Sequence, residues 1–265
     1  MSSVQESDQQ GHSTVERTLS ILELVVGRKD GISLAELAKE LAFPKSTIHR
    51  LIDILTSREY VELNMQTQKY SAGLKSIEIG VSALRSMEIV DVSSAYMRDL
   101  ARQSGETSFL AVLNEGEIVY LHKAEGSQSI RTTAQLGMRR PVHCTAVGKA
   151  LLSALSTEEV ERILADKGMA AYTANTITDA QSMLAELRQI RIDGCAVDRE
   201  EIEIGLTCFA APVFQFMGQI AGAISLAGPT IRVKEKQDEY MRLVNEAARQ
   251  ISRRMGYVPA MRSNL

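Results

Sequence analysis

The segment between Pro44 and Arg58 is predicted to form a helix, and one side of this helix carries residue types that are suited to DNA contacts. Apolar residues at helical spacing form its buried face, at Ile48, Leu51, Ile52 and Leu55. The opposite face then carries Lys45, Ser46, Thr47, His49, Arg50 and Asp53. An arginine can form two hydrogen bonds to guanine, hydroxyl and imidazole groups can reach bases or phosphates, and a lysine most readily meets a phosphate. The pattern predicts a helix that reads the major groove, and the alternative is a solvated amphipathic helix.

Two helices before this segment supply the framework that a DNA-reading helix needs. Ser33 and Glu36 form a predicted capping box, which opens a short second helix. The connection after it is tight, and Pro44 suits the first turn of the third helix because its missing N–H would be unpaired there. A first helix is predicted over residues 14–27, with one apolar stripe at Val15, Leu19, Leu22 and Val26.

A hairpin is predicted after the third helix. Strand-like pieces at residues 60–63 and 69–72 flank a polar turn. Three helices with a tight turn before the third, followed by a hairpin, are the order of a winged helix-turn-helix, which we predict over residues 14–73. Arg17 and Lys69 are weaker candidates for phosphate contacts. The complete order of elements favours DNA binding over the amphipathic-helix alternative.

The charge of the chain restricts how it can bind DNA. The net charge is −3 and the pI is near 5.9. Residues 1–80 carry nine Lys and Arg against eleven Asp and Glu, so a site built on bulk attraction is disfavoured. Residues 44–58 carry three Lys and Arg against one Asp. Any DNA site must therefore be local to this segment.

Residues 74–90 are expected to form a linker helix. Its apolar residues have the spacing of a narrow coiled-coil seam, at Leu74, Ile77, Val81 and Leu84. A lone helix gains little from its own hydrogen bonds, so this seam should be covered by another chain. The spacing therefore predicts a homodimer.

Residues 91–257 change to a mixed pattern of strands and helices, for which a mostly antiparallel sheet flanked by helices is the economical packing. The expected fold is α+β in two domains, with tails at residues 1–13 and 258–265. The polar N-terminus lacks a signal-peptide core, and no run approaches the roughly 18 apolar residues of a membrane span. We therefore expect a cytoplasmic protein without a membrane partner.

The cysteines give little support for catalysis or a metal site. Cys144, Cys195 and Cys208 are odd in number and form no CxxC pair, which favours reduced thiols. Cys144 beside His143 suggests a nucleophile, but adjacent residues rarely present their side chains to each other. The spacing of these residues is also poor for a metal. We expect no enzyme, no metal and no cofactor.

Two sets of motifs resemble the IclR family of transcription regulators. Ile32 to Ala38 and Phe43 to Leu51 are similar to its DNA-binding domain. Leu136 to Ala150, Asp198 to Glu201, and the stretch from Gly205 to Pro229 are similar to its effector domain. The resemblance implies a GAF-like sensing domain, dimers or dimers of dimers, and no catalysis.

The resemblance also implies a pocket for a small effector, commonly an organic acid. It places six residues around this effector, namely Ala146, Val147, Asp198, Leu206, Cys208 and Ser225. The turn at Thr145 to Gly148 independently predicts free backbone N–H groups at a helix start, which suit a carboxylate. The sequence leaves open whether Arg139, Arg140 and His143 face the pocket. It also does not indicate whether the protein is a repressor or an activator. The alternative function is a small-molecule sensor that acts through protein contacts and not through DNA.

Overall fold

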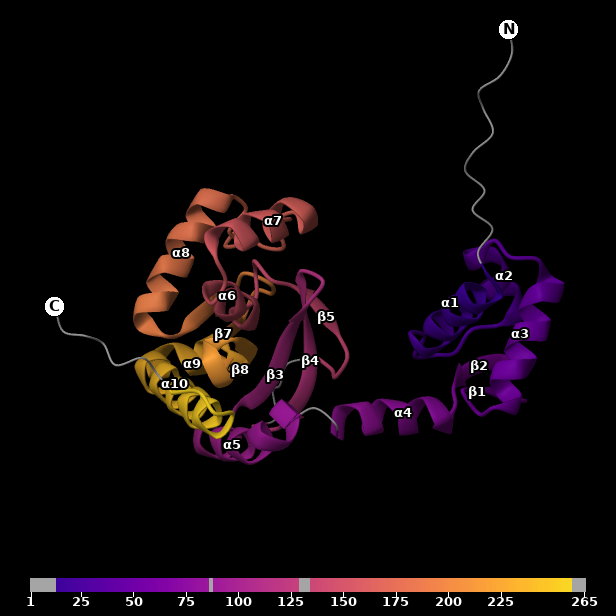
Figure 1. The fold of residues 1–265 in the computed structure, drawn as a ribbon, viewed down its shortest axis with the longest axis horizontal. Coiled ribbons are helices and arrows are strands. Elements are labelled where there is room, and N and C mark those ends of the chain that lie inside the picture. Colours follow the sequence, from indigo (N-terminus) through magenta and orange to yellow (C-terminus); the bar gives the residue numbers. More distant parts are fainter. Residues whose placement is uncertain (1–12, 86–87, 129–133, 259–265) are drawn as a thin grey trace, which may run out of the picture. The chain divides into compact units, whose positions relative to one another are not determined.

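The computed structural model describes residues 13–85, 88–128 and 134–258. Its contacts divide the chain into a smaller unit, residues 1–86, and a larger unit, residues 87–265, each drawn in Figure 1. This confirms the predicted two-domain α+β architecture. Most of the two predicted tails lies outside the described residues. None of the helices in the described ranges combines the length and apolarity that a membrane span requires.

The smaller unit consists of helices and one hairpin. Its elements are α1 (Thr14–Val26), α2 (Leu34–Leu41), α3 (Lys45–Ser57), β1 (Val61–Asn64), β2 (Lys69–Ala72) and α4 (Leu74–Arg85). Capping boxes at Ser13 and Ser33 start the first two helices. Ala42 ends α2 in the left-handed conformation, with φ of 53°, and so turns the chain sharply into α3. The antiparallel hairpin completes the winged helix-turn-helix predicted from the sequence.

Helix α3 buries the predicted face, whereas α1 does not. Ile48, Leu51, Ile52 and Leu55 are all in the core of the smaller unit. In α1 the buried residues are Ile21 and Val25, while Val15, Leu19 and Val26 are 47–68% exposed. The predicted stripe of α1 was therefore wrong. Its apolar residues surround the helix and allow two stripes, and only the packing of α2 and α3 selects one of them.

The linker helix is shorter than expected. Helix α4 ends at Arg85, and α5 (Glu88–Ser104) begins before the predicted boundary at residue 90. The reason is Ile89, which is buried in the larger unit against Gly222. In α4, Leu74, Ile77 and Val81 are 42–62% exposed, and the side chain of Leu84 lies outside the described residues.

The larger unit is built on one antiparallel sheet of six strands. The order across the sheet is β5-β4-β3-β8-β7-β6. The strands are β3 (Thr107–Asn114), β4 (Glu117–Ala124), β5 (Arg139–Pro141), β6 (Ala196–Arg199), β7 (Leu206–Phe214) and β8 (Ile220–Pro229). The remaining helices are α6 (Ala146–Ser153), α7 (Thr157–Lys167), α8 (Ala180–Asp193), α9 (Thr230–Val233) and α10 (Gln237–Arg254).

The two faces of this sheet have different covers. Phe209 of β7 packs edge-on against Tyr240 of α10, and α10 also contacts α5. Its neighbour Cys208 must face the opposite side, because side chains alternate along a strand. That side is covered by α6, which contacts β6, β7 and β8, and α8 packs outside α6 (Figure 1).

Small side chains line the sheet face under α6. The register places Cys208 opposite Ala227, and Ala210 opposite Ser225. Because these side chains are short, the sheet and α6 cannot close completely over them. The result is a hollow near the carboxyl end of β8.

Candidate functional site

The exposed face of α3 carries the DNA-contacting residues predicted from the sequence. Lys45, Ser46, His49 and Arg50 are exposed, and Thr47 is half-buried. The helix begins at Lys45, its N-cap residue Pro44 provides no side-chain hydrogen bond, and its first turn has no acidic residue. Its first N–H groups and positive dipole are therefore available to a phosphate.

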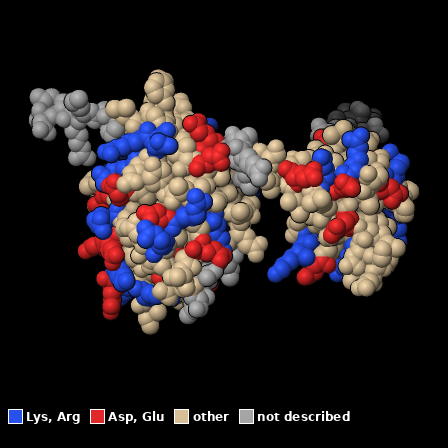
Figure 2. All heavy atoms as spheres, turned by 90° about the horizontal axis from the view of Figure 1, so that it is seen from below, with Lys and Arg blue, Asp and Glu red and all other residues tan. Residues whose placement is uncertain are grey.

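Asp53 has a specific partner on this face. Its Oδ2 lies 2.9 Å from Nδ1 of His49, one helical turn earlier. This contact fixes the imidazole, so that Nε2 remains available at the surface. Arg50 is exposed and has no ion pair among the described residues. Figure 2 shows the positive and negative side chains mixed on the smaller unit, as the balanced composition requires.

The two weaker phosphate candidates have different settings. Arg17 is half-buried, and its guanidinium lies 5.6 Å from the centre of the Phe43 ring. The ring therefore covers one face of the guanidinium. Lys69 begins β2 and is half-buried. Before it, the side chain of Asn64 accepts hydrogen bonds from the N–H groups of Gln66 and Thr67 and fixes the turn of the wing.

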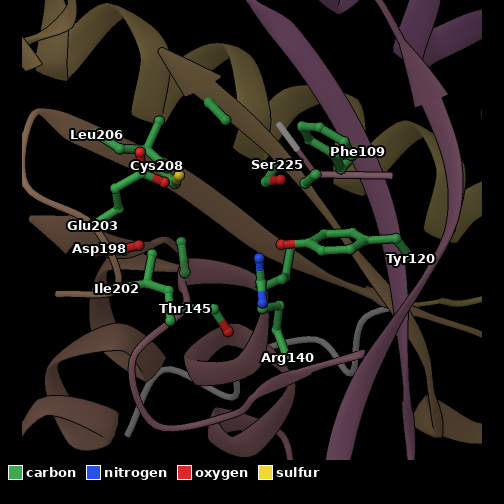
Figure 3. Close-up of a pocket in the computed structure, with 14 residues that line it drawn as sticks. Phe109, Tyr120, Arg140, Thr145, Asp198, Ile202, Glu203, Leu206, Cys208 and Ser225 are labelled. Carbon is green, nitrogen blue, oxygen red and sulfur yellow. The ribbon is translucent and has the colours of Figure 1, made fainter. Parts of the chain in front are cut away.

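A pocket lies between the sheet and the start of α6 in the larger unit (Figure 3). The space between its atoms measures about 530 Å³, part of it open to solvent. All six residues predicted from the resemblance line it, namely Ala146, Val147, Asp198, Leu206, Cys208 and Ser225. The sheet brings these residues together from four separate segments of the chain.

Thr145 organises the floor of the pocket. Its side chain accepts a hydrogen bond from the N–H of Gly148, which caps α6 and leaves the N–H groups of Ala146 and Val147 near the cavity. Gly148 is required here, because a Cβ would lie 2.2 Å from the carbonyl oxygen of Val142. The loop can therefore pack directly on the first turn of the helix.

Asp198 is the most perturbed acid of the site. It is 1% exposed, and its Oδ1 accepts a hydrogen bond of 2.7 Å from the N–H of Glu201. Its Oδ2 is buried without a partner. Burial raises the pKa of this carboxyl to about 7. A ligand that donates a hydrogen bond to Oδ2 would satisfy an atom that is otherwise costly to bury.

The opposite end of the pocket is basic and aromatic. Arg140 and Tyr120 point toward each other in Figure 3, across the cavity from Asp198 and Glu203. Burial raises the pKa of the Tyr120 hydroxyl, which therefore stays protonated. Phe109 packs against Tyr120, with 5.1 Å between the ring centres, and extends this wall.

The sequence left three neighbouring residues open, and the structure separates them. Arg140 lines the pocket. Arg139 points away and binds the backbone and side chain of Asn114. His143 is buried, and its Nε2 lies 3.0 Å from the carbonyl oxygen of Ala170. Sequence reasoning missed the wall formed by Phe109 and Tyr120, although their place in two predicted strands could have marked them as facing the same side.

Lys149 supports the pocket from behind α6. It is fully buried, and its Nζ lies 2.6 Å from both Glu201 Oε1 and the carbonyl oxygen of Val197. Glu186 completes this ion-pair group at 3.2 Å. Since Glu201 also binds Asp198 through its backbone, Lys149 holds the segment that carries the acidic end of the pocket.

The cysteines do not form a reactive centre. Burial raises the pKa of Cys144 to about 12 and that of Cys208 well above its ordinary value. Both thiols therefore stay protonated, which is the unreactive form. Within the described ranges, no three His, Cys, Asp or Glu residues gather as a metal site would need.

Two segments that together cover most of the chain match the two domains of one protein family. Residues 14–64 match the IclR helix-turn-helix domain, and residues 81–253 match the C-terminal domain of bacterial IclR transcriptional regulators. The chain belongs to the IclR family. It is therefore a DNA-binding transcription regulator and not an enzyme, as the sequence predicted.

Individual relatives cover nearly the whole chain. The transcriptional regulator KdgR of Escherichia coli is 35% identical over 92% of this chain and 93% of its own length. The crystal structure of Thermotoga maritima IclR is 32% identical, with a TM-score of 0.78 over 92% of this chain and 99% of that one. An IclR homologue from Microbacterium hydrocarbonoxydans, crystallised with 4-hydroxybenzoate, is 22% identical, with a TM-score of 0.82 over 92% of this chain and 99% of that one. The last likeness concerns the fold alone.

Proposed function

We propose that a small organic acid with a hydroxyl group binds in the pocket beside α6 and modulates the binding of this regulator to its operator. The observation that carries the proposal is the placement of a basic and an acidic end in one cavity (Figure 3). Arg140 and the first N–H groups of α6 suit a carboxylate, while the unpartnered Oδ2 of Asp198 suits a hydroxyl donor.

The shape of the cavity supports an aromatic acid as the first probe. Phe109 and Tyr120 add aromatic surface at the basic end of the pocket, with their ring planes inclined at 51°. 4-Hydroxybenzoate carries a carboxylate and a hydroxyl at opposite ends of a ring, and it is the molecule crystallised with the Microbacterium homologue. A second carboxylate beside ionised Asp198 would be repelled, so a hydroxyl at this end is favoured.

Calorimetric titration with 4-hydroxybenzoate and a panel of aliphatic hydroxy acids tests this proposal. A ligand at 100 times its dissociation constant should add about 2.7 kcal/mol to the stability of the protein. Arg140→Met should abolish this response, whereas Arg139→Met removes the same charge from the adjacent residue and should retain it. Cys208→Phe should fill the cavity and also abolish binding, while operator binding without effector remains. If Arg140→Met bound the ligand with the same affinity as the wild-type protein, the assignment of this site would be wrong.

Operator binding is assigned to α3, with Arg50 as the residue that reads a base and Lys45 as a phosphate contact. A gel mobility-shift assay on the DNA upstream of the protein's own gene, with and without effector, tests the coupling. Binding of the effector should change the free energy of operator binding, typically by about 1–3 kcal/mol. Binding of the operator should change the free energy of effector binding by the same amount, because the coupling is reciprocal. A regulator with this target works in the bacterial cytoplasm, where we place it.

We further infer a homodimer that uses α4. Its residues Leu74, Ile77 and Val81 are exposed on a helix that has few contacts of its own within the smaller unit. Ile77→Asp should halve the mass measured by light scattering and weaken operator binding, because two half-sites would no longer be bound together. Lys75→Asp changes the polar face of the same helix and should leave the mass unchanged. An unchanged mass for both variants would exclude α4 from the interface.

A further inference from the structure

A second hollow of the larger unit lies at the edge of the sheet, where β7 continues beyond its pairing with β6, and it shares no lining residue with the effector pocket. It is bordered by the end of α8, by β7 beyond Ala210 and by α10. Its residues are Arg191, Ile192, Asp193, Gly194, Ala211, Pro212, Phe214, Arg242, Asn245, Ala248, Arg249, Ser252, Arg253 and Tyr257, which we call the arginine groove. The space between its atoms measures about 1,510 Å³, open to solvent.

The arginine groove is strongly positive on a chain that is negative overall. It contains four arginines and one aspartate, a balance of +3, whereas the whole chain has −3. Arg191 donates to the carbonyl oxygens of Ser153 and Leu155, so its charge is held in place without being neutralised. In the described part of the chain, Arg249 pairs with Glu246, but neither Arg242 nor Arg253 has an ion pair.

The floor of the groove is apolar. The Phe214 and Tyr257 rings pack at 5.1 Å, and Ala211 and Pro212 continue this surface along β7. Ile192 stands at the rim with 74% of its surface exposed. An apolar floor between cationic side chains matches a partner that is both acidic and hydrophobic.

The exposed edge of β7 excludes one mode of binding. Strand β6 pairs with β7 only at residues 207–210, so β7 continues into the groove without a neighbouring strand. Pro212 has no N–H there, and the N–H of Phe214 donates to Ser252 Oγ at 3.0 Å. The edge therefore offers few free donors to an added strand, and a partner must be recognised through its side chains.

We propose that the arginine groove binds an acidic amphipathic segment of a partner protein. Its carboxylates would pair with Arg242 and Arg253, and its apolar side chains would cover Phe214, Tyr257 and Ile192. Arginine suits this role because its planar guanidinium pairs with carboxylates through two hydrogen bonds. The site is separate from both the DNA-binding face and the effector pocket.

Fluorescence anisotropy with the full-length protein tests the proposal. The probe is a fluorescein-labelled synthetic peptide rich in Glu, Leu and Phe, and the control peptide has Ser in place of Leu and Phe. The wild-type protein should bind the probe, with affinity that falls as salt rises. Arg242→Glu/Arg253→Glu should weaken binding by about tenfold or more, and Arg242→Gln/Arg253→Gln should weaken it less. Ile192→Asp should weaken it as well.

Arg162→Glu/Arg188→Glu is the matched control, because it changes the net charge equally at exposed positions of α7 and α8 outside the groove. It should bind the probe like the wild-type protein. Three results would overturn the proposal. These are equal binding by the groove and control variants, equal binding of the probe and the Ser peptide, or a loss of mass by light scattering in the groove variant, which would make the groove an interface between copies of this chain.

Discussion

Asp198→Asn should stabilise the protein, and the gain should depend on pH. In the wild-type protein burial raises the pKa of this carboxyl from 3.8 to about 7. Between these two pH values the folded protein binds more protons than the unfolded chain, so the wild-type loses stability as the pH rises through this window. Asparagine carries no charge, and its amide oxygen can still accept the hydrogen bond from the N–H of Glu201. The variant should therefore escape this loss.

The size of the effect follows from the shift. Each pKa unit corresponds to about 1.4 kcal/mol, so a shift of about three units amounts to about 4 kcal/mol above pH 7 and to nothing below pH 4. For a domain of this size, each kcal/mol moves the midpoint of thermal unfolding by about 2–4 °C. The difference between the variant and the wild-type should therefore grow to roughly 8 °C or more at about pH 8.

Calorimetry of the full chain at several pH values measures this difference. Asp166→Asn provides the control, because it makes the same change at a carboxylate that has 71% of its side chain exposed. A constant difference between Asp198→Asn and the wild-type from about pH 4 to about pH 8 would refute the reasoning, since the carboxyl would then ionise as it does in water.

Four other single variants and one double variant test separate parts of the molecule. Arg50→Ala should cost about 1–3 kcal/mol on the operator and relax one base preference, whereas Lys45→Ala should weaken all DNA alike in mobility-shift assays. An equal loss on operator and random DNA for both variants would contradict the roles assigned to them. Gly148→Ala should lower thermal stability by roughly 2 kcal/mol or more, because its Cβ would lie 2.2 Å from a backbone oxygen, and an unchanged midpoint would show that the loop moves freely. Lys149→Met should cost about 3–5 kcal/mol in denaturation, since it leaves Glu201 buried without its cation, and Lys149→Met/Glu201→Leu should recover much of this loss. A double variant no more stable than the single one would contradict this account of the pair.

Several features of the fold could be predicted because they depend on residues close together in the chain. The capping box of Ser33 and Glu36 and the buried face of α3 involve residues within a few positions of each other, and the structure has both. Periodicity alone failed for α1, where apolar residues on every side of the helix give two possible stripes. Periodicity also predicted a linker helix that continues to residue 90, whereas α4 ends at Arg85. Ile89 belongs to the larger unit because it packs against Gly222 of β8, and a contact with so distant a strand leaves no local pattern in the sequence.

The pocket shows most clearly the division between sequence and tertiary structure. By itself, the sequence determined the order of elements, the polar face of α3 and the helix start at Thr145, and the resemblance to the IclR family indicated six pocket residues. Only the tertiary structure decided that Arg140 faces the cavity while Arg139 faces Asn114, since this depends on the register of β5 against β4. In a strand, a shift by one residue exchanges the two faces, and no local signal fixes that choice. The partnerless oxygen of Asp198 likewise arises only when β6, β7 and α6 enclose it.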